Sequence, residues 1–180
     1  RSGENPVSVI SDANFLPKVK AKPKHHKAMR WQDVPAFYMG LKARDAMAAQ
    51  ALKFTCLTGS RTGEVLGMKW EEVDPDTRLW TCPADRMKGG EIHRVPLTDE
   101  MLAIIEPLRA MQSDYVFEGQ KRHKPLSNMA MLMLLRRMEV EGVTVHGFRS
   151  TFRDWASEAA NAPREVAEMS LAHKVGSDVE

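Results

Sequence analysis

The sequence has little of several residue types, and each shortage excludes a class of protein. Only two cysteines, Cys56 and Cys82, occur among 180 residues. Both lie in apolar surroundings, which indicates reduced core thiols and excludes the disulfide framework of a small secreted protein. No apolar run approaches the roughly 18 residues of a membrane span, and the N-terminus lacks the basic-then-apolar layout of a signal peptide. We therefore expect a cytoplasmic protein, which in a bacterium includes the nucleoid.

One stretch near the N-terminus lacks acidic residues altogether. The net charge of +2 is too small to separate a DNA-binding protein from an ordinary enzyme, but residues 18–30 carry charge of one sign only. Prolines break any helix before residue 30, so 1–30 is predicted to be a basic linker. It is a solvated tether, or an arm that contacts phosphates if the remainder binds DNA. The lysines and arginine of 18–30 are Lys18, Lys20, Lys22, Lys24, Lys27 and Arg30.

Residues 31–180 are predicted to form one domain of the α+β class, mainly α. Asp33 is a plausible N-cap of the first helix, with Pro35 just inside. Two strands, at about 78–82 and 92–97, are joined by the Lys88-Gly89-Gly90 turn into an antiparallel hairpin. The hairpin belongs to a helical body with further helices at about 44–57, 61–70, 99–111, 127–140, 146–160 and 163–171.

His146, Arg149 and Arg153 form the first candidate site. At about 100° per residue they gather within about 60° of one another on one face of a helix. Free N–H groups at the helix N-terminus already favour an anion, so this face is expected to meet a ligand. Arg149 is therefore expected to face that ligand and not the core; a solvated cationic face is the other interpretation. A second face, expected in the core, carries Phe148, Phe152 and Trp155.

A second arginine, Arg61, lies between Gly59 and Gly63. The glycines allow a tight turn between helices that directs the side chain inward. Glu64, one turn further on, is placed to hold the guanidinium, and a guanidinium of restricted geometry suits a bidentate grip on phosphate. A structural Arg-Glu pair that caps a turn is the other interpretation.

Two further residues are weaker candidates. Lys88, at the tip of the glycine-rich hairpin, is a mobile proton donor or merely an exposed charge. His173 follows a short helix in the segment Leu171-Ala172-His173-Lys174, where a lone histidine is more often structural than reactive.

Taken in order, four segments resemble the motifs of the tyrosine recombinases: TGSRTGEVLGMKW, RMKGGEIHRVPL, HGFR and LAHK. Among these enzymes the chain is similar to the prophage and genomic-island integrases related to the enzyme of phage P4. The resemblance runs from about Lys24 to the last residue. It implies the catalytic-domain fold of this family and a site-specific recombinase that cuts and rejoins DNA through a 3′-phosphotyrosyl intermediate, integrating or excising a mobile element.

The resemblance also implies roles for six residues. Arg61 and Arg149 match the two arginines that bind the scissile phosphate, where attack adds negative charge to the non-bridging oxygens. His146 matches a histidine that positions the phosphate and assists proton movement, and His173 matches a hydrogen-bond donor to a phosphate oxygen. Two matches remain: the hairpin lysine that protonates the leaving 5′ oxygen, and a supporting acidic position. These are Lys88 and Glu64.

The nucleophilic tyrosine of the family has no counterpart among the 180 residues. The sequence contains only Tyr38 and Tyr115, and neither matches the family position, which falls just beyond Glu180. Both are interpreted as structural, so these residues alone are expected to be catalytically incomplete. The arm-type and core-binding domains of the family do not fit before Lys18 and are expected to be absent as well.

The resemblance implies double-stranded DNA attachment sites as partners. Lys18, Lys20, Lys22, Lys24, Lys27 and Arg153 are expected to contact DNA. A homotetramer on DNA is expected for the full-length protein and a monomer for these residues alone. No cofactor and no metal are expected, because histidines and carboxylates do not cluster at ligand spacing, which disfavours a metal-dependent phosphodiesterase. A non-catalytic DNA-binding regulator with the same fold remains the alternative function.

Overall fold

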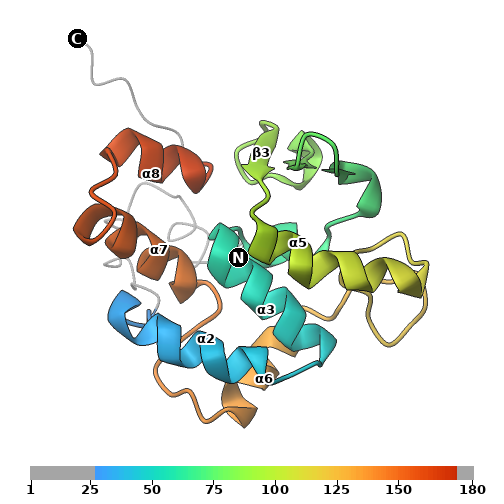
Figure 1. The fold of residues 1–180 in the computed structure, drawn as a ribbon, viewed down its shortest axis with the longest axis horizontal. Coiled ribbons are helices and arrows are strands. Elements are labelled where there is room, and N and C mark those ends of the chain that lie inside the picture. Colours follow the sequence, from blue (N-terminus) through green and yellow to red (C-terminus); the bar gives the residue numbers. More distant parts are fainter. Residues whose placement is uncertain (1–26, 174–180) are drawn as a thin grey trace, which may run out of the picture.

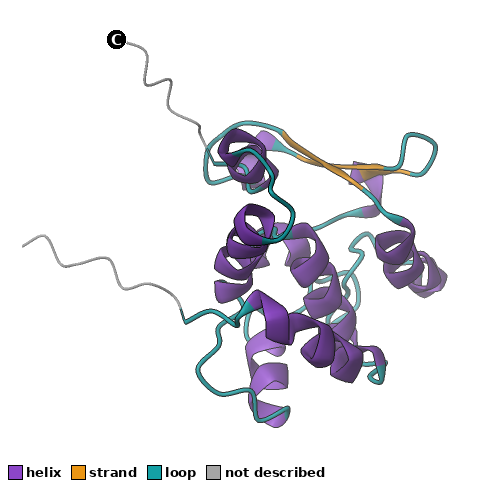
Figure 2. Cartoon of the chain, turned by 60° about the vertical axis from the view of Figure 1, so that its left-hand side comes forward, coloured by secondary structure: helices purple, strands orange, loops and turns teal. Residues whose placement is uncertain are grey.

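The computed structural model describes residues 27–173. Lys18, Lys20, Lys22 and Lys24 therefore lie outside the described residues. Helices make up most of this part, and a small sheet lies at one edge (Figures 1 and 2). In the described range no helix is long and apolar enough to cross a membrane. The α-helices are α2 (Val34–Lys42), α3 (Met47–Thr58), α4 (Thr62–Leu66), α5 (Asp99–Ile105), α6 (Ala130–Arg137), α7 (Gly147–Glu158) and α8 (Arg164–Ser170).

Helix α3 runs through the middle of the helical body and packs against α2, α4, α5, α6 and α7. Ala49, Leu52 and Phe54 are fully buried, and Thr55, on another face, is also buried because its hydroxyl donates to the Ala51 carbonyl within the helix. A helix covered on all sides is the usual centre of a packed domain. The end of α3 is thereby fixed, and the Arg61 segment follows directly.

The sheet has three antiparallel strands in the order β1-β2-β3, one more than predicted. Strands β2 (Leu79–Cys82) and β3 (His93–Pro96) form the expected hairpin, with Trp80 opposite Val95 and Cys82 opposite His93. The additional strand β1 (Val73–Asp74) forms because the Asp74 carboxylate accepts hydrogen bonds from the backbone N–H groups of Asp76 and Thr77. This tight turn folds the chain back so that Val73 pairs with Trp80.

Several predicted boundaries differ from the structure for local reasons. The helix expected over 99–111 is α5 followed by a 3-10 helix, Glu106–Met111, because Pro107 has no N–H to continue the α-helical pattern. The helix expected over 127–140 is shorter because Glu139 adopts a left-handed φ of 56°. The helix expected over 61–70 ends at Leu66, and a 3-10 helix, Trp70–Glu72, follows. The proposed N-cap is wrong in its chemistry, since the Asp33 side chain makes no capping hydrogen bond.

The end of the basic segment packs on the domain. The Lys27 carbonyl accepts a hydrogen bond from the Thr144 backbone N–H at 3.0 Å, and the Met29 carbonyl accepts one from the Thr151 hydroxyl at 2.6 Å. Gly147 has no side chain at the crossing, where a Cβ would lie 2.2 Å from the Lys27 carbonyl oxygen. The chain therefore already packs against the helical body at Lys27, four residues before Trp31.

Candidate active site

The Arg149 side chain lies where three of the sequence motifs meet. Its Nη1 donates to the Gly59 carbonyl oxygen at 2.6 Å, and its Nη2 donates to the Leu171 carbonyl oxygen at 2.6 Å. Nη2 also lies 3.0 Å from Nε2 of His173. Arg149 is expected to face a ligand and not the core. The expectation that it avoids the core is wrong, because the residue is only 5% exposed. The side chain joins α7 to the end of α3 and the end of α8, and this joint fixes the guanidinium.

His173 is held between a cation and a carboxylate. Its Nδ1 lies 2.5 Å from Oε2 of Glu168, and Nε2 faces Arg149. Arginine has no acceptor, so Nε2 must accept from Arg149 while Nδ1–H donates to Glu168. The same carboxylate forms a 2.8 Å ion pair with Nε of Arg153 through its other oxygen, without the alignment of a hydrogen bond. His173 and Arg153 lower the pKa of Glu168, with the hydrogen bond from His173 as the largest cause.

Arg61 has the expected partner. Its Nη1 lies 2.8 Å from Oε1 of Glu64, and its backbone N–H donates to the other carboxylate oxygen, also at 2.8 Å. Glu64 is 3% exposed, whereas the Arg61 side chain is 20% exposed. The buried carboxylate thus anchors one side of the guanidinium and leaves another side accessible. Because the carboxylate also caps the first turn of α4, the Arg61 side chain is fixed to the helix start.

Gly59 allows the turn that brings Arg61 and Arg149 together. It has a left-handed φ of 62°, and an added Cβ would lie 2.9 Å from Cδ2 of Leu171. Only glycine combines this backbone conformation with such close packing. The backbone carbonyl of the same residue is the acceptor for Arg149.

The charge of Arg61 acts on the buried guanidinium of Arg149. Burial is the largest cause that lowers the pKa of Arg149, to about 10, and the charge of Arg61 is the second cause. Arg149 still carries its proton at neutral pH, and it donates hydrogen bonds to two neutral carbonyls and an imidazole. A cation buried beside another cation, without a carboxylate in direct contact, favours binding of an anion.

The hairpin that carries Lys88 borders the end of α8. A cavity of about 170 Å³ lies between the hairpin residues Met87, Gly89 and Ile92 and the residues Ala172 and His173. Lys88 itself is exposed and makes no hydrogen bond or ion pair within residues 27–173. The structure therefore places the Lys88 loop beside the site, while the Lys88 ammonium group makes no hydrogen bond or ion pair within the described residues.

His146 lies at the start of α7. It is exposed and precedes the first residue of the helix, where its carbonyl accepts a hydrogen bond from the Arg149 backbone N–H at 3.2 Å. Arg153, the other neighbour on the predicted cationic face, is 53% exposed and turned toward Glu168.

Three residues that the motifs did not single out also belong to this region: His93, Glu168 and Arg86. Burial lowers the pKa of His93, and Arg149 and Arg61 lower it further, whereas Glu64 opposes them. The ring lines the cavity beside His173 and a second one, of about 520 Å³, between β3 and α8. The sequence signal that could have identified His93 is its place in the alternating pattern of strand β3, opposite the buried Cys82. Glu168, five residues before His173, had no comparable signal.

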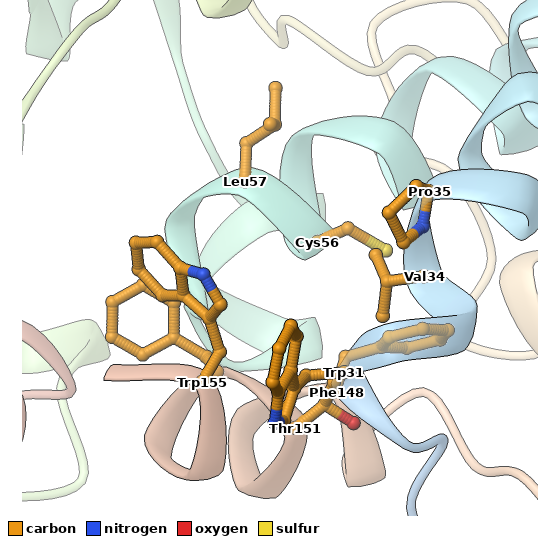
Figure 3. A pocket seen from close by; sticks show the side chains of 9 residues that line it. Trp31, Val34, Pro35, Cys56, Leu57, Phe148, Thr151 and Trp155 are labelled. Carbon is orange, nitrogen blue, oxygen red and sulfur yellow. The ribbon is translucent and has the colours of Figure 1, made fainter. Parts of the chain in front are cut away.

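An apolar pocket of about 320 Å³ opens on the other side of α7 (Figure 3). The predicted aromatic core face divides here: Phe148 is 2% exposed, but Trp155 is 44% exposed and lines the pocket. Cys56 lines it too, and burial raises the pKa of its thiol. None of the described residues that line the pocket is charged, and the pocket is separate from the cationic cluster.

Neither tyrosine of the sequence lies in the cluster. The Tyr38 hydroxyl donates to Oε1 of Glu100 at 3.2 Å, and burial raises its pKa. Tyr115 pairs through its backbone with Lys69, in an isolated bridge. Between residues 27 and 173 there is also no group of three or more histidine, cysteine or acidic side chains that could hold a metal ion.

Residues 27–180 match the model of the phage integrase family. The chain is 32% identical over 174 residues to the prophage integrase IntZ of Escherichia coli K12, covering 94% of this chain and 42% of IntZ. It is 29% identical over 195 residues to the integrase of Enterobacteria phage P4, covering 97% of this chain and 44% of that protein. The chain thus spans less than half the length of these relatives.

Solved structures show the same fold. A lambda integrase tetramer bound to a Holliday junction superposes with a TM-score of 0.67 at 15% identity, covering 97% of this chain and 56% of that one. XerA recombinase gives a TM-score of 0.67 at 17% identity, covering 87% and 58%. The lambda integrase catalytic core gives 0.61 at 16% identity, covering 86% of this chain and 96% of that core. The predicted fold class is confirmed, mainly helical with a small antiparallel sheet.

Proposed function

Because the chain belongs to the phage integrase family, we propose that it is the catalytic part of a site-specific recombinase that cuts and rejoins DNA through a 3′-phosphotyrosyl intermediate, integrating or excising a mobile element. The main support is the meeting of three distant segments at one buried cation. Arg149 contacts the Gly59 carbonyl, the Leu171 carbonyl and the His173 ring. A cationic cluster assembled in this way is suited to a single phosphodiester.

The two arginines are proposed to bind the scissile phosphate. Glu64 anchors Arg61, and two backbone carbonyls anchor Arg149, so both guanidinium groups are fixed before substrate arrives. Fixed donors stabilise the extra negative charge of the transition state without reorganisation. His146 and His173 are proposed to hydrogen-bond the phosphate. For His173 to donate through Nε2, this nitrogen must take up a proton and give up its present contact with Arg149.

Strand cleavage then needs a nucleophile and an acid. A tyrosine oxygen attacks phosphorus and gives up its proton, for which His146 is the proposed acceptor. The bond to the 5′ oxygen breaks, and Lys88 is proposed to give that oxygen its proton. Rejoining is the reverse, with the 5′ hydroxyl attacking the phosphotyrosine. Tyr38 and Tyr115 lie elsewhere. It stays a prediction that the nucleophile follows residue 180 and that residues 1–180 alone form no covalent product.

The partners are proposed from the same reaction. Solved relatives include a lambda integrase dimer bound to a core site and a tetramer bound to a Holliday junction. For this protein we propose double-stranded attachment sites, contacted by Arg153 and the basic residues before 28, and a homotetramer on DNA in the full-length form. Residues 1–180 alone are proposed to be monomeric, without metal or cofactor, and the DNA substrate agrees with a cytoplasmic location.

The test is formation of a covalent protein–DNA adduct by the full-length protein on nicked DNA that carries the attachment site of the element. Arg149→Lys and Arg61→Lys keep the charge but lose the planar fork, and each is expected to slow adduct formation by about 100-fold or more. Arg44→Lys is the matched control, because Arg44 is exposed in the turn between α2 and α3. The proposal fails if the parent protein forms no adduct, or if Arg149→Lys cleaves as fast as the control.

A further inference from the structure

Arg86 ties the root of the Lys88 hairpin to the helix that holds Arg61. It is the last residue of the 3-10 helix Ala84–Arg86, which follows β2. Its Nη1 donates to the Glu64 backbone carbonyl at 3.0 Å, and its Nη2 donates to Oε2 of Glu72. Glu64 therefore binds Arg61 with its carboxylate and Arg86 with its backbone, so one residue links the phosphate-binding arginine to the hairpin.

The surroundings of Arg86 fix it closely. The Arg86 side chain is 21% exposed and that of Glu72 is 8% exposed. Oε2 of Glu72 also accepts a hydrogen bond from Nε1 of Trp80 at 3.0 Å, and Trp80 is fully enclosed in the sheet. Gly67 leaves room for the guanidinium, since a Cβ there would lie 2.6 Å from Nη1 of Arg86. The position of Arg86 is thus set by β2, by the 3-10 helix Trp70–Glu72 and by the end of α4.

Arg86 precedes Lys88 by only two residues. Met87, in between, is buried, and its carbonyl accepts the Gly90 N–H at 3.0 Å. From Lys88 to Ile92 the loop is exposed, and Lys88 makes no hydrogen bond or ion pair within residues 27–173 that would fix it. The direction in which the lysine leaves the fold therefore depends on Arg86 and Met87, and Arg86 is the one bonded to the Arg61 helix.

From this geometry we infer that Arg86 is a positioning residue for Lys88: it holds the hairpin root on α4 so that the lysine is presented to the phosphate bound by Arg61 and Arg149. The inference rests on the proposed function, in which Lys88 protonates the leaving oxygen. It predicts that loss of Arg86 impairs proton delivery and not phosphate binding.

A change of leaving group separates these two effects. In a DNA substrate whose bridging 5′ oxygen at the cleavage site is replaced by sulfur, the leaving group is a thiolate. A thiol has a pKa of about 8.5, far below that of an alcohol, so its departure needs no proton donor. A variant that has lost only the general acid is slow on the oxygen substrate and is rescued on the sulfur substrate. A variant that has lost phosphate binding is slow on both.

The experiment measures the rate of covalent adduct formation by the full-length protein on both substrates. Arg86→Met keeps the length of the side chain but not its hydrogen bonds. We expect it to slow the oxygen substrate by at least about 30-fold, within the range of general-acid effects, and to leave the sulfur substrate within about 3-fold of the parent. Lys88→Ala should behave in the same way, and Arg149→Lys should be slow on both substrates.

A second variant covers the case in which Arg86→Met does not fold. Gly67→Ala removes no charged residue but forces the Arg86 guanidinium to move, and the same rescue by sulfur is expected. Arg78→Met is the matched control: Arg78 pairs with Asp99 at 2.5 Å beside the same hairpin, and both rates should be unchanged.

The outcomes separate the inference from the proposed function. If sulfur rescues Lys88→Ala but neither Arg86→Met nor Gly67→Ala, then Arg86 does not act through Lys88 and the inference alone is wrong. The inference is also wrong if Arg86→Met cleaves the oxygen substrate at the parent rate. If sulfur does not rescue Lys88→Ala, Lys88 is not the acid, and the inference falls together with that part of the proposed function.

Discussion

The two glycines that flank Arg61 should respond to alanine in opposite ways. Gly59 has a left-handed φ of 62° and close neighbours, whereas an added Cβ on Gly63 would meet nothing within 4 Å. Gly63 lies in the first turn of α4 and is exposed. From the sequence alone, both glycines are interpreted in the same way, as residues that allow a tight turn. The structure predicts that Gly59→Ala destabilises the domain and that Gly63→Ala does not.

The magnitudes follow from the local geometry. A non-glycine residue in the left-handed region costs about 1–2 kcal/mol. The new methyl of Gly59→Ala would also lie 2.9 Å from Cδ2 of Leu171 and 3.3 Å from Cγ of Phe152, and such overpacking adds roughly 1 kcal/mol or more. The lower entropy of the unfolded chain returns about 0.4–1 kcal/mol. A net loss of about 2 kcal/mol is expected, against a gain of about 0.5–1 kcal/mol for Gly63→Ala in its helix.

Thermal unfolding measures both changes. For a domain of this size about 1 kcal/mol moves the melting midpoint by roughly 2–4 °C, so Gly59→Ala should melt about 4–8 °C below the parent. Gly63→Ala should melt at the parent temperature or about 1–4 °C above it. Equal midpoints for Gly59→Ala and the parent would refute the left-handed turn, and with it the placement of the Gly59 carbonyl against Arg149.

Two other predictions concern the charged groups around the site. Glu64→Gln removes the buried ion pair with Arg61 and should lower the free energy of unfolding by roughly 1–2 kcal/mol in urea titrations; an unchanged value would show that the pair contributes nothing. His93 has a lowered pKa in the folded protein, chiefly through burial, so the unfolded chain takes up the proton first as the pH falls and stability is lost from about pH 6.5 downward. His93→Gln should therefore lose less stability than the parent between about pH 7.5 and pH 5.5, and equal losses in the two proteins would contradict this.

Most of the fold could be predicted because its signals are local. The hairpin follows from alternating residues around Lys88-Gly89-Gly90, and the strands β2 and β3 form close to the expected ranges. The errors lie where one residue decides between two similar conformations. Pro107 converts the end of a predicted α-helix into a 3-10 helix, and the carboxylate of Asp74 creates a strand of two residues that no periodicity could indicate.

The sequence motifs propose a set of site residues, but they do not indicate how these residues are arranged. The helical period places Arg149 on the cationic face, yet the structure buries it against the carbonyls of Gly59 and Leu171. Backbone acceptors have no sequence signature, since every residue has a carbonyl. For the same reason the role of Arg86 is invisible in the sequence, because its partner in α4 is a carbonyl and not a side chain.

The distribution of acceptors around the cations explains how the cluster remains open to phosphate. Neutral carbonyls contact Arg149, whereas the carboxylates of Glu64 and Glu168 lie one step outward, on Arg61 and on Arg153 with His173. Three arginines and two glutamates leave one positive charge while His173 is neutral, which matches the single charge of a phosphodiester. The proposed transition state carries one negative charge more. A proton on Nε2 of His173 would balance it, with Glu168 already in place to accept from Nδ1. Had a carboxylate instead of two carbonyls held Arg149, the cluster would be neutral before substrate arrived, and the attraction for phosphate would be lost.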